Sequence, residues 1–136
     1  MELLRCRARL SVLWVFMAVG TAAAMLLSFL KPGVIENVMS GEWGGMPLGE
    51  GLMVAYALFF LIPLLVAVLC LTLSGSANRW LNFILGIIWV LWFIFEIVQS
   101  AIGEAEPAAL WLMLAAGILV SLFIAFFAWK LPEKEA

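Results

Sequence analysis

The sequence predicts an all-α membrane protein, an up-down bundle of four transmembrane helices with a short amphipathic helix in the first outer loop. Hydrophobic residues make up 67% of the 136 residues and charged residues only 12%. A soluble domain averages about 45–50% apolar and about 25% charged residues. Four apolar stretches each have the roughly 20 residues that a helix needs to cross a hydrocarbon core of ~30 Å. They cover residues 10–30, 51–73, 80–102 and 108–131, within one domain over residues 1–136.

The first span, residues 10–30, is expected to remain in the mature protein. Its apolar run of 21 residues is longer than the ~7–15 residues of a signal-peptide core. The alanines at 22–24 resemble a cleavage site, which leaves a cleaved signal peptide as the alternative, but they lie in the middle of the run.

Small residues recur at four-residue spacing in the first and fourth spans. Such stripes let helix backbones approach closely in lipid, where packing drives helix association. The stripes consist of Gly20, Ala24 and Ser28 in the first span and Gly117, Ser121 and Ala125 in the fourth. We expect them to face each other within one bundle, with Gly20 or Ala24 close to Gly117 or Ser121. A seam between two copies in a homo-oligomer is the alternative.

The first outer loop, residues 31–49, is longer than the other connections. Apolar residues at 34, 35, 38 and 39 recur at helical spacing, which predicts a short amphipathic helix on the outer membrane face. An irregular turn is expected over residues 42–47. Two interpretations of this loop remain open: a linker that Trp43 anchors at the interface, and a lid over an outward-facing cavity.

The second span, residues 51–73, carries Pro63 at its centre, where a kink is expected because proline removes one backbone hydrogen bond. The kink either adjusts packing or acts as a hinge. Cys70 should behave as a small buried apolar residue. In the connection that follows, residues 74–78, Ser76 or Asn78 is expected to cap the third helix. Short connections also predict that the second, third and fourth helices pack in sequential order.

Four tryptophans lie near the predicted membrane boundaries, the level that amphipathic indoles favour. They are Trp14, Trp80, Trp111 and Trp129. Trp89 and Trp92 instead lie inside the third span.

Glu96, in the third span, is the acidic residue that lies inside a predicted span. An ionisable group at this depth is costly, and it is a functional candidate by default. We expect Glu96 to face the bundle interior in its protonated form, near Tyr56 and Gln99. It either fixes helix register through hydrogen bonds or serves as a ligand or proton site.

The distribution of basic residues predicts the orientation, because cytoplasmic loops carry an excess of Lys and Arg. Six of the seven basic residues lie at the two ends or in the connection between the second and third spans. Lys31 is the exception. Both termini should therefore be cytoplasmic in a multi-pass protein of the cell (inner) membrane.

Several classes of function are excluded by composition. The chain has no histidine and no aspartate, which removes His-based metal sites and Ser-His or Cys-His catalytic pairs. Cys6 and Cys70 are too far apart to form a CxxC pair. A net charge of -2 gives no reason to expect a nucleic-acid partner. No catalytic residue, metal or cofactor is expected, and membrane lipids are the expected partners.

Several short motifs carry a resemblance to a known family. They are Leu30-Lys31-Pro32-Gly33-Val34-Ile35-Glu36, Met39-Ser40-Gly41, Ile62-Pro63, Asn78-Arg79-Trp80 with Asn82 and Gly86, and Ala128-Trp129-Lys130. With these motifs the chain resembles a family of small prokaryotic four-span membrane proteins filed as a domain of unknown function. The resemblance implies a four-helix membrane protein and supplies no activity.

Two classes of function fit these observations. The first is a non-enzymatic membrane protein that is structural or accessory, or that binds lipid or another small ligand. The alternative is a small transporter or channel subunit that uses Glu96 as a proton or cation site.

Overall fold

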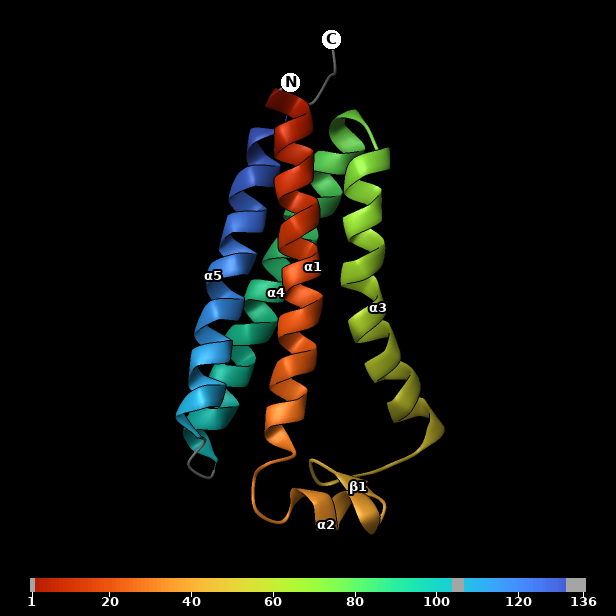
Figure 1. The fold of residues 1–136 in the computed structure, drawn as a ribbon, viewed down its shortest axis with the longest axis vertical. Coiled ribbons are helices and arrows are strands. Elements are labelled where there is room, and N and C mark those ends of the chain that lie inside the picture. Colours follow the sequence, from red (N-terminus) through yellow and green to blue (C-terminus); the bar gives the residue numbers. More distant parts are fainter. Residues whose placement is uncertain (1, 104–106, 132–136) are drawn as a thin grey trace.

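Four long helices form the protein, as the sequence predicts, in a computed structural model that describes residues 2–103 and 107–131 (Figure 1). The helices are α1 (Glu2–Ser28), α3 (Glu50–Thr72), α4 (Gly75–Ile102) and α5 (Ala108–Lys130). Each has 23 to 28 residues and is apolar enough to cross a membrane. At about 1.5 Å per residue, each is long enough to span the hydrocarbon core.

The first outer loop folds into a helix and a hairpin at one end of the bundle. Helix α2 (Val34–Met39) has the bounds that its apolar spacing predicts. Strands β1 (Glu42–Trp43) and β2 (Met46–Pro47) pair in antiparallel fashion. Gly44 and Gly45 join the strands with φ of 56° and 78°, as a two-residue hairpin turn with two positive φ angles requires. The prediction of an irregular turn here is therefore wrong, and the two adjacent glycines are the missed signal.

The bundle has two distinct ends. We call the end where α1 begins and α5 ends the base, and the opposite end, which carries α2 and the hairpin, the mouth (Figure 1). Two helices extend further toward the base than the sequence predicts, because apolar windows locate the hydrocarbon crossing and helices continue beyond it. Helix α1 begins at Glu2 and α4 at Gly75, where the predicted spans begin at residues 10 and 80.

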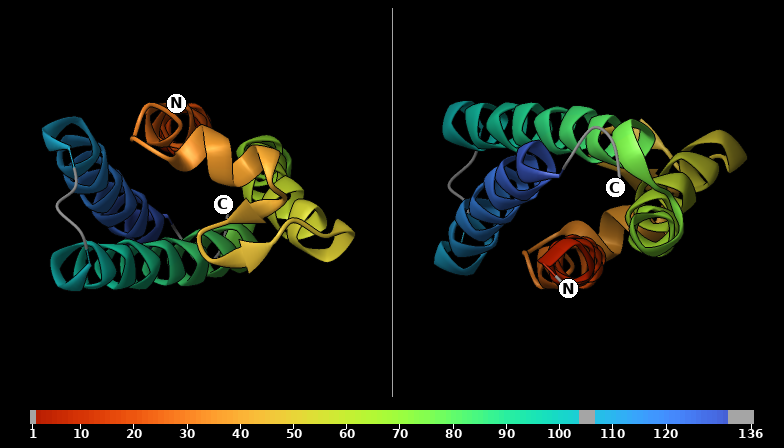
Figure 2. Two further views of the ribbon diagram at one scale, coloured as in Figure 1. Left: turned by 90° about the horizontal axis from the view of Figure 1, so that it is seen from below. Right: turned by 90° about the horizontal axis from the view of Figure 1, so that it is seen from above.

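The order of helices around the bundle differs from the sequential packing that short connections predict. Helix α1 packs against both α3 and α5, and α5 packs along α4. The backbones of α3 and α4 approach each other at few positions, and mainly side chains bridge them, although only residues 73 and 74 separate the two helices in the chain. Figure 2 shows why: α4 leans toward α5 and away from α3 as it runs to the mouth. A tight turn fixes where two helices meet but not the angle between them.

Helices α1 and α5 pack against each other, as predicted, but Gly20 does not take part in that contact, and Gly86 and Gly117 instead make close contacts between α4 and α5. A Cβ added at Gly86 of α4 would lie 3.2 Å from the backbone nitrogen of Ala125 on α5. At Gly117 of α5 it would lie 2.6 Å from the ring of Phe93 on α4. At Gly20 of α1 it would meet no atom within 4 Å. The α5 stripe therefore serves the α4 contact, and Gly20 borders open space.

The core is densest at the base. Leu10, Trp14, Cys70, Ile124 and Ala128 are all fully buried there. Trp14, which the sequence places at the membrane interface, is thus a core residue, and its ring contacts Trp89 edge-on at a centroid distance of 5.6 Å. The interface rule for tryptophan fails here because Trp14 finds a hydrogen-bond partner inside the bundle.

That partner belongs to a buried polar network. The Nε1 of Trp14 and the Sγ of Cys70 both donate to Oδ1 of Asn82, at 2.7 and 3.0 Å. The Nδ2 of Asn82 donates to Oδ1 of Asn78 at 2.6 Å. The Nδ2 of Asn78 donates to the carbonyl oxygens of Cys70 and Leu73, at 2.9 and 3.1 Å. Asn78 therefore satisfies the last carbonyls of α3 and does not cap α4, whose N-cap is Ser74 with no side-chain hydrogen bond.

Candidate binding cavity at the mouth

A cavity of about 450 Å³ lies in the mouth half of the bundle. Residues from all four long helices line it, together with residues of the first outer loop. Because α4 leans away from α3 toward the mouth, the four helices cannot close on one another there (Figure 2). At the base, by contrast, the space between the helices is filled by buried side chains. This volume lies within the usual range for small-molecule sites.

The hairpin covers the mouth of this cavity. Trp43 and Gly44 are among the residues that line it. The Nε1 of Trp43 donates to the hydroxyl oxygen of Tyr56 on α3, and its ring contacts that of Phe29 at a centroid distance of 5.0 Å. These contacts tie the hairpin to α3 and to the end of α1. Of the two interpretations of the loop, the lid is the one that this geometry matches.

Aromatic side chains make up much of the wall. Most come from the hairpin, α3 and α4, and one comes from α1: Trp43, Tyr56, Phe59, Phe60, Trp92, Phe93 and, from α1, Phe16. The ring of Phe59 packs on those of Trp92 and Trp89, at centroid distances of 5.3 and 5.6 Å. Trp89 in turn contacts Trp14, so a continuous series of rings separates the cavity from the polar network of the base.

The small residues of α1 form the opposite wall. Gly20, Ala24 and Ser28 all line the cavity. The hydroxyl of Ser28 donates to the carbonyl oxygen of Met25 at 2.6 Å, and that of Thr21 donates to Met17 at 2.7 Å. These two hydroxyl groups bond to their own helix. The stripe that predicts helix packing therefore makes room for the cavity.

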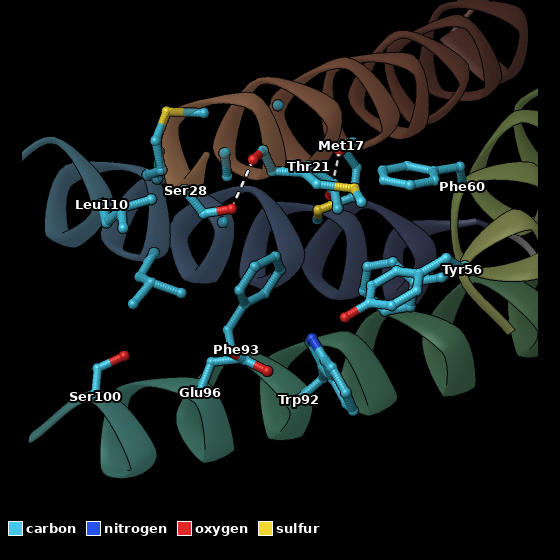
Figure 3. Close-up of a pocket in the computed structure, with 18 of the residues that line it drawn as sticks. Met17, Thr21, Ser28, Tyr56, Phe60, Trp92, Phe93, Glu96, Ser100 and Leu110 are labelled. Atoms are coloured by element: carbon cyan, nitrogen blue, oxygen red, sulfur yellow. Dashed lines mark hydrogen bonds between the residues drawn. The ribbon is translucent and has the colours of Figure 1, made fainter. Parts of the chain in front are cut away.

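Glu96 lies on the cavity wall, half-buried, and its carboxyl group points into the cavity between Phe93 and Trp92 (Figure 3). Its inward orientation agrees with the sequence-based expectation. Tyr56 also lines the cavity, across from Glu96 on α3, whereas Gln99 is exposed and lies outside it. Lys31, which follows the end of α1, is the other charged residue in the wall among the residues that the structure describes.

Pro63 is fully buried within an uninterrupted α3, closer to the base end of this helix than Tyr56 and Phe59. Helix α3 leans away from α1 as it approaches the mouth (Figure 1). That lean widens the bundle where Tyr56 and Phe59 contribute to the cavity wall. Whether Pro63 also acts as a hinge stays a prediction.

One helix carried a signal for the site that residue-by-residue reasoning missed. The buried face of α4 consists of Asn78, Asn82, Gly86, Trp89 and Phe93, at spacings of three and four residues. Continued by the same spacing, this face reaches Glu96 and Ser100, and both line the cavity. One face of α4 therefore carries both the polar network of the base and, nearer the mouth, Glu96.

Comparisons with known proteins agree with the fold and give no activity. The chain matches no curated protein and no solved structure. A family model described as a family of unknown function, DUF6326, matches residues 4–132, which is nearly the whole chain. The match contains all four spans and the loop that covers the cavity. This four-helix membrane protein therefore belongs to the family DUF6326.

Proposed function

We propose that this protein binds a small, largely apolar ligand in the mouth cavity, without chemical conversion of that ligand. The observation that carries the proposal is the cavity itself, about 450 Å³ in volume, with aromatic rings on one wall and a lid above it. Pockets of this size with apolar walls and a few polar groups are typical of small-molecule sites. The polar groups here, Glu96, Ser100 and Lys31, would orient a ligand that carries one polar end.

The mouth is proposed to face away from the cytoplasm, in the cell membrane. The arginines of the first turns of α1 and Arg79 near the start of α4 all lie at the base. The mouth carries Lys31 together with Glu36, Glu42 and Glu50. Since positive charges stay on the cytoplasmic side, a ligand would enter from the outer side or from the outer leaflet.

A cavity-filling substitution tests the proposal. Gly20→Leu is expected to fill part of the cavity, because Gly20 lines it and a Cβ at this position meets no atom within 4 Å. The matched control is Val19→Leu at the adjacent residue of α1, which is 63% exposed. The neutral probe is radiolabelled para-tert-butylphenol, measured by equilibrium dialysis against protein in nanodiscs, with the uptake of empty nanodiscs subtracted.

We expect saturable binding by the unsubstituted protein and by Val19→Leu, and binding weaker by about tenfold, or about 1.4 kcal/mol, in Gly20→Leu. Uptake equal to that of empty nanodiscs would refute the proposal. Equal affinities in all three proteins would place the bound probe elsewhere and refute it as well.

Transport is the second candidate, and the place of Glu96 on the cavity wall favours it. Ionisable groups within spans often mark ion and proton pathways. Proteoliposomes that contain a pH-sensitive dye distinguish the two candidates. A proton flux that depends on the protein and is lost in Glu96→Gln supports transport. The same passive leak with and without protein supports binding alone.

A further inference from the structure

The chemistry of the ligand can be narrowed from the charges that line the cavity. This step rests on the proposed function, since it concerns the occupant of the same cavity. The two charged residues in the described wall lie at different depths. Lys31 follows α1, and its backbone nitrogen hydrogen-bonds to the carbonyl oxygen of Ser28 at the helix end. Glu96 lies six residues before the end of α4 at Ile102, or about 9 Å along the helix. The carboxyl group of Glu96 is therefore attached at the deeper position in the cavity wall.

Aromatic rings surround that carboxyl group. Trp92 and Phe93 precede Glu96 by one helical turn, and Figure 3 shows all three side chains pointing into the same space. Tyr56 faces them from α3 (Figure 3). Ring faces carry negative potential and attract cations, and tryptophan does so most strongly. A carboxyl group and several rings around one space make up the usual recognition site for an alkylated ammonium group.

The walls also distinguish between kinds of cation. A metal ion needs several oxygen, nitrogen or sulfur ligands, and the described residues hold no group of three acidic or cysteine side chains close enough to bind one. A strongly hydrated ion would have to give up bound water for contact with aromatic carbon, which disfavours its binding here. An organic cation carries its charge on apolar substituents, which pack against these rings at little cost in hydration.

We propose that the cavity binds an organic cation, a quaternary or alkylated ammonium group attached to an apolar body. In this complex Glu96 carries its negative charge, in contrast to the protonated form expected for the empty site, because a cation beside a carboxyl group favours the ionised form. The ammonium group lies beside this carboxylate, against Trp92 and Phe93, and the apolar body lies against Phe59 and Phe60 of α3. Both a lipid headgroup with an amine and a free organic cation have this chemistry.

A pair of isosteres tests the charge preference. Para-tert-butylphenol and the para-hydroxyphenyl-trimethylammonium ion have the same shape and differ in one positive charge. Both are titrated by equilibrium dialysis against the full-length protein in phosphatidylglycerol nanodiscs, with empty nanodiscs subtracted. The variants are Glu96→Gln, which removes the negative charge and keeps the side-chain shape, and Lys31→Gln, which removes the other charge.

We expect the cation to bind the unsubstituted protein at least about tenfold more tightly than the neutral isostere. This preference should disappear in Glu96→Gln, with neutral binding unchanged, and should persist in Lys31→Gln. Equal affinities for the two isosteres in the unsubstituted protein would overturn the cation proposal and leave ligand binding intact. Failure of both to bind would overturn ligand binding itself.

The same titration in phosphatidylethanolamine nanodiscs distinguishes the two sources. Weaker binding of the cation there, with Glu96→Gln unaffected by the lipid, identifies the amine headgroup as the occupant. Equal affinity in both lipids identifies a free organic cation.

Discussion

The indole nitrogen of Trp14 on α1 donates to the side-chain oxygen of Asn82 on α4 at 2.7 Å, and both residues are fully buried. The same oxygen accepts the thiol proton of Cys70 on α3. One amide thus connects three helices at the base. In lipid every helix can exchange apolar contacts for similar contacts with acyl chains, so directional bonds of this kind determine which helix lies beside which.

The Trp14–Asn82 bond should contribute measurably to stability. Trp14→Phe keeps an aromatic ring and removes the donor. We expect the free energy of unfolding to fall by between about 0.6 kcal/mol, the average for hydrogen bonds between transmembrane helices, and about 1.7 kcal/mol, the maximum. Unfolding in mixed micelles, followed by circular dichroism, measures the change. Trp80→Phe, at a residue that is 45% exposed, is the control and should change stability less. Equal losses of stability at both positions would show that the Trp14–Asn82 hydrogen bond does not account for the contribution of Trp14.

Two glycines should respond in opposite ways to the same substitution. Gly86→Leu forces α4 and α5 apart, because a Cβ there lies 3.2 Å from the Ala125 backbone, and overpacking costs about 1–3 kcal/mol or more. Gly20→Leu enters open space and removes a helix-destabilising glycine, so it should leave stability unchanged or raise it by up to about 1 kcal/mol. Thermal unfolding in detergent compares them. A loss at Gly20 as large as that at Gly86 would contradict the cavity.

Removing the Tyr56 hydroxyl should loosen the lid. Tyr56→Phe keeps the ring and deletes the acceptor of the Trp43 hydrogen bond. We expect faster hydrogen exchange over residues 42–47 and faster ligand dissociation, with little change in global stability. Thr72→Val is the control, because the Thr72 hydroxyl is exposed and bonds only to its own helix at the base. Unchanged exchange in the hairpin would mean that the contact with Phe29 holds the lid alone.

The orientation can be tested with impermeant maleimides on intact cells. In a Cys6→Ser background, Ser40→Cys at the mouth should be labelled from outside, and Ser76→Cys at the base should be labelled only after permeabilisation. Both residues are exposed. The opposite pattern would place the cavity on the cytoplasmic side. A cysteine introduced at Glu104 should behave like Ser40→Cys, and one at Lys134 like Ser76→Cys, although both lie outside the described residues.

The four spans could be predicted because their length and apolar composition follow from the thickness of the bilayer. Which face of each span turns toward the other helices could not be predicted from the sequence. Helices α1, α3 and α5 are apolar on all sides, so a side chain that contacts lipid and one that contacts another helix have the same chemistry. The burial of Trp14 and the open space beside Gly20 both depend on that rotation.

Helix α4 is different because its inward face contains Asn78, Asn82 and Glu96, which lipid would penalise. There the sequence indicates the inward orientation of Glu96, and the structure agrees. The cavity itself could not be predicted from the sequence. It depends on the angle between α3 and α4, and neither the two-residue connection nor the composition of these helices specifies that angle.

The two halves of α4 differ in what their residues contact, and this difference has a consequence for which substitutions the protein can accept. Asn78, Asn82 and Gly86, which contact other helices, lie in the first half of α4, and the residues of α4 that border the cavity lie in its second half: Trp92, Phe93, Glu96 and Ser100. Substitutions at Trp92, which is 42% exposed, can therefore alter ligand preference with less effect on helix packing than substitutions at Phe93, whose ring packs against Gly117 of α5. One half of this helix can therefore vary with the ligand while the other half keeps the helices of the base together.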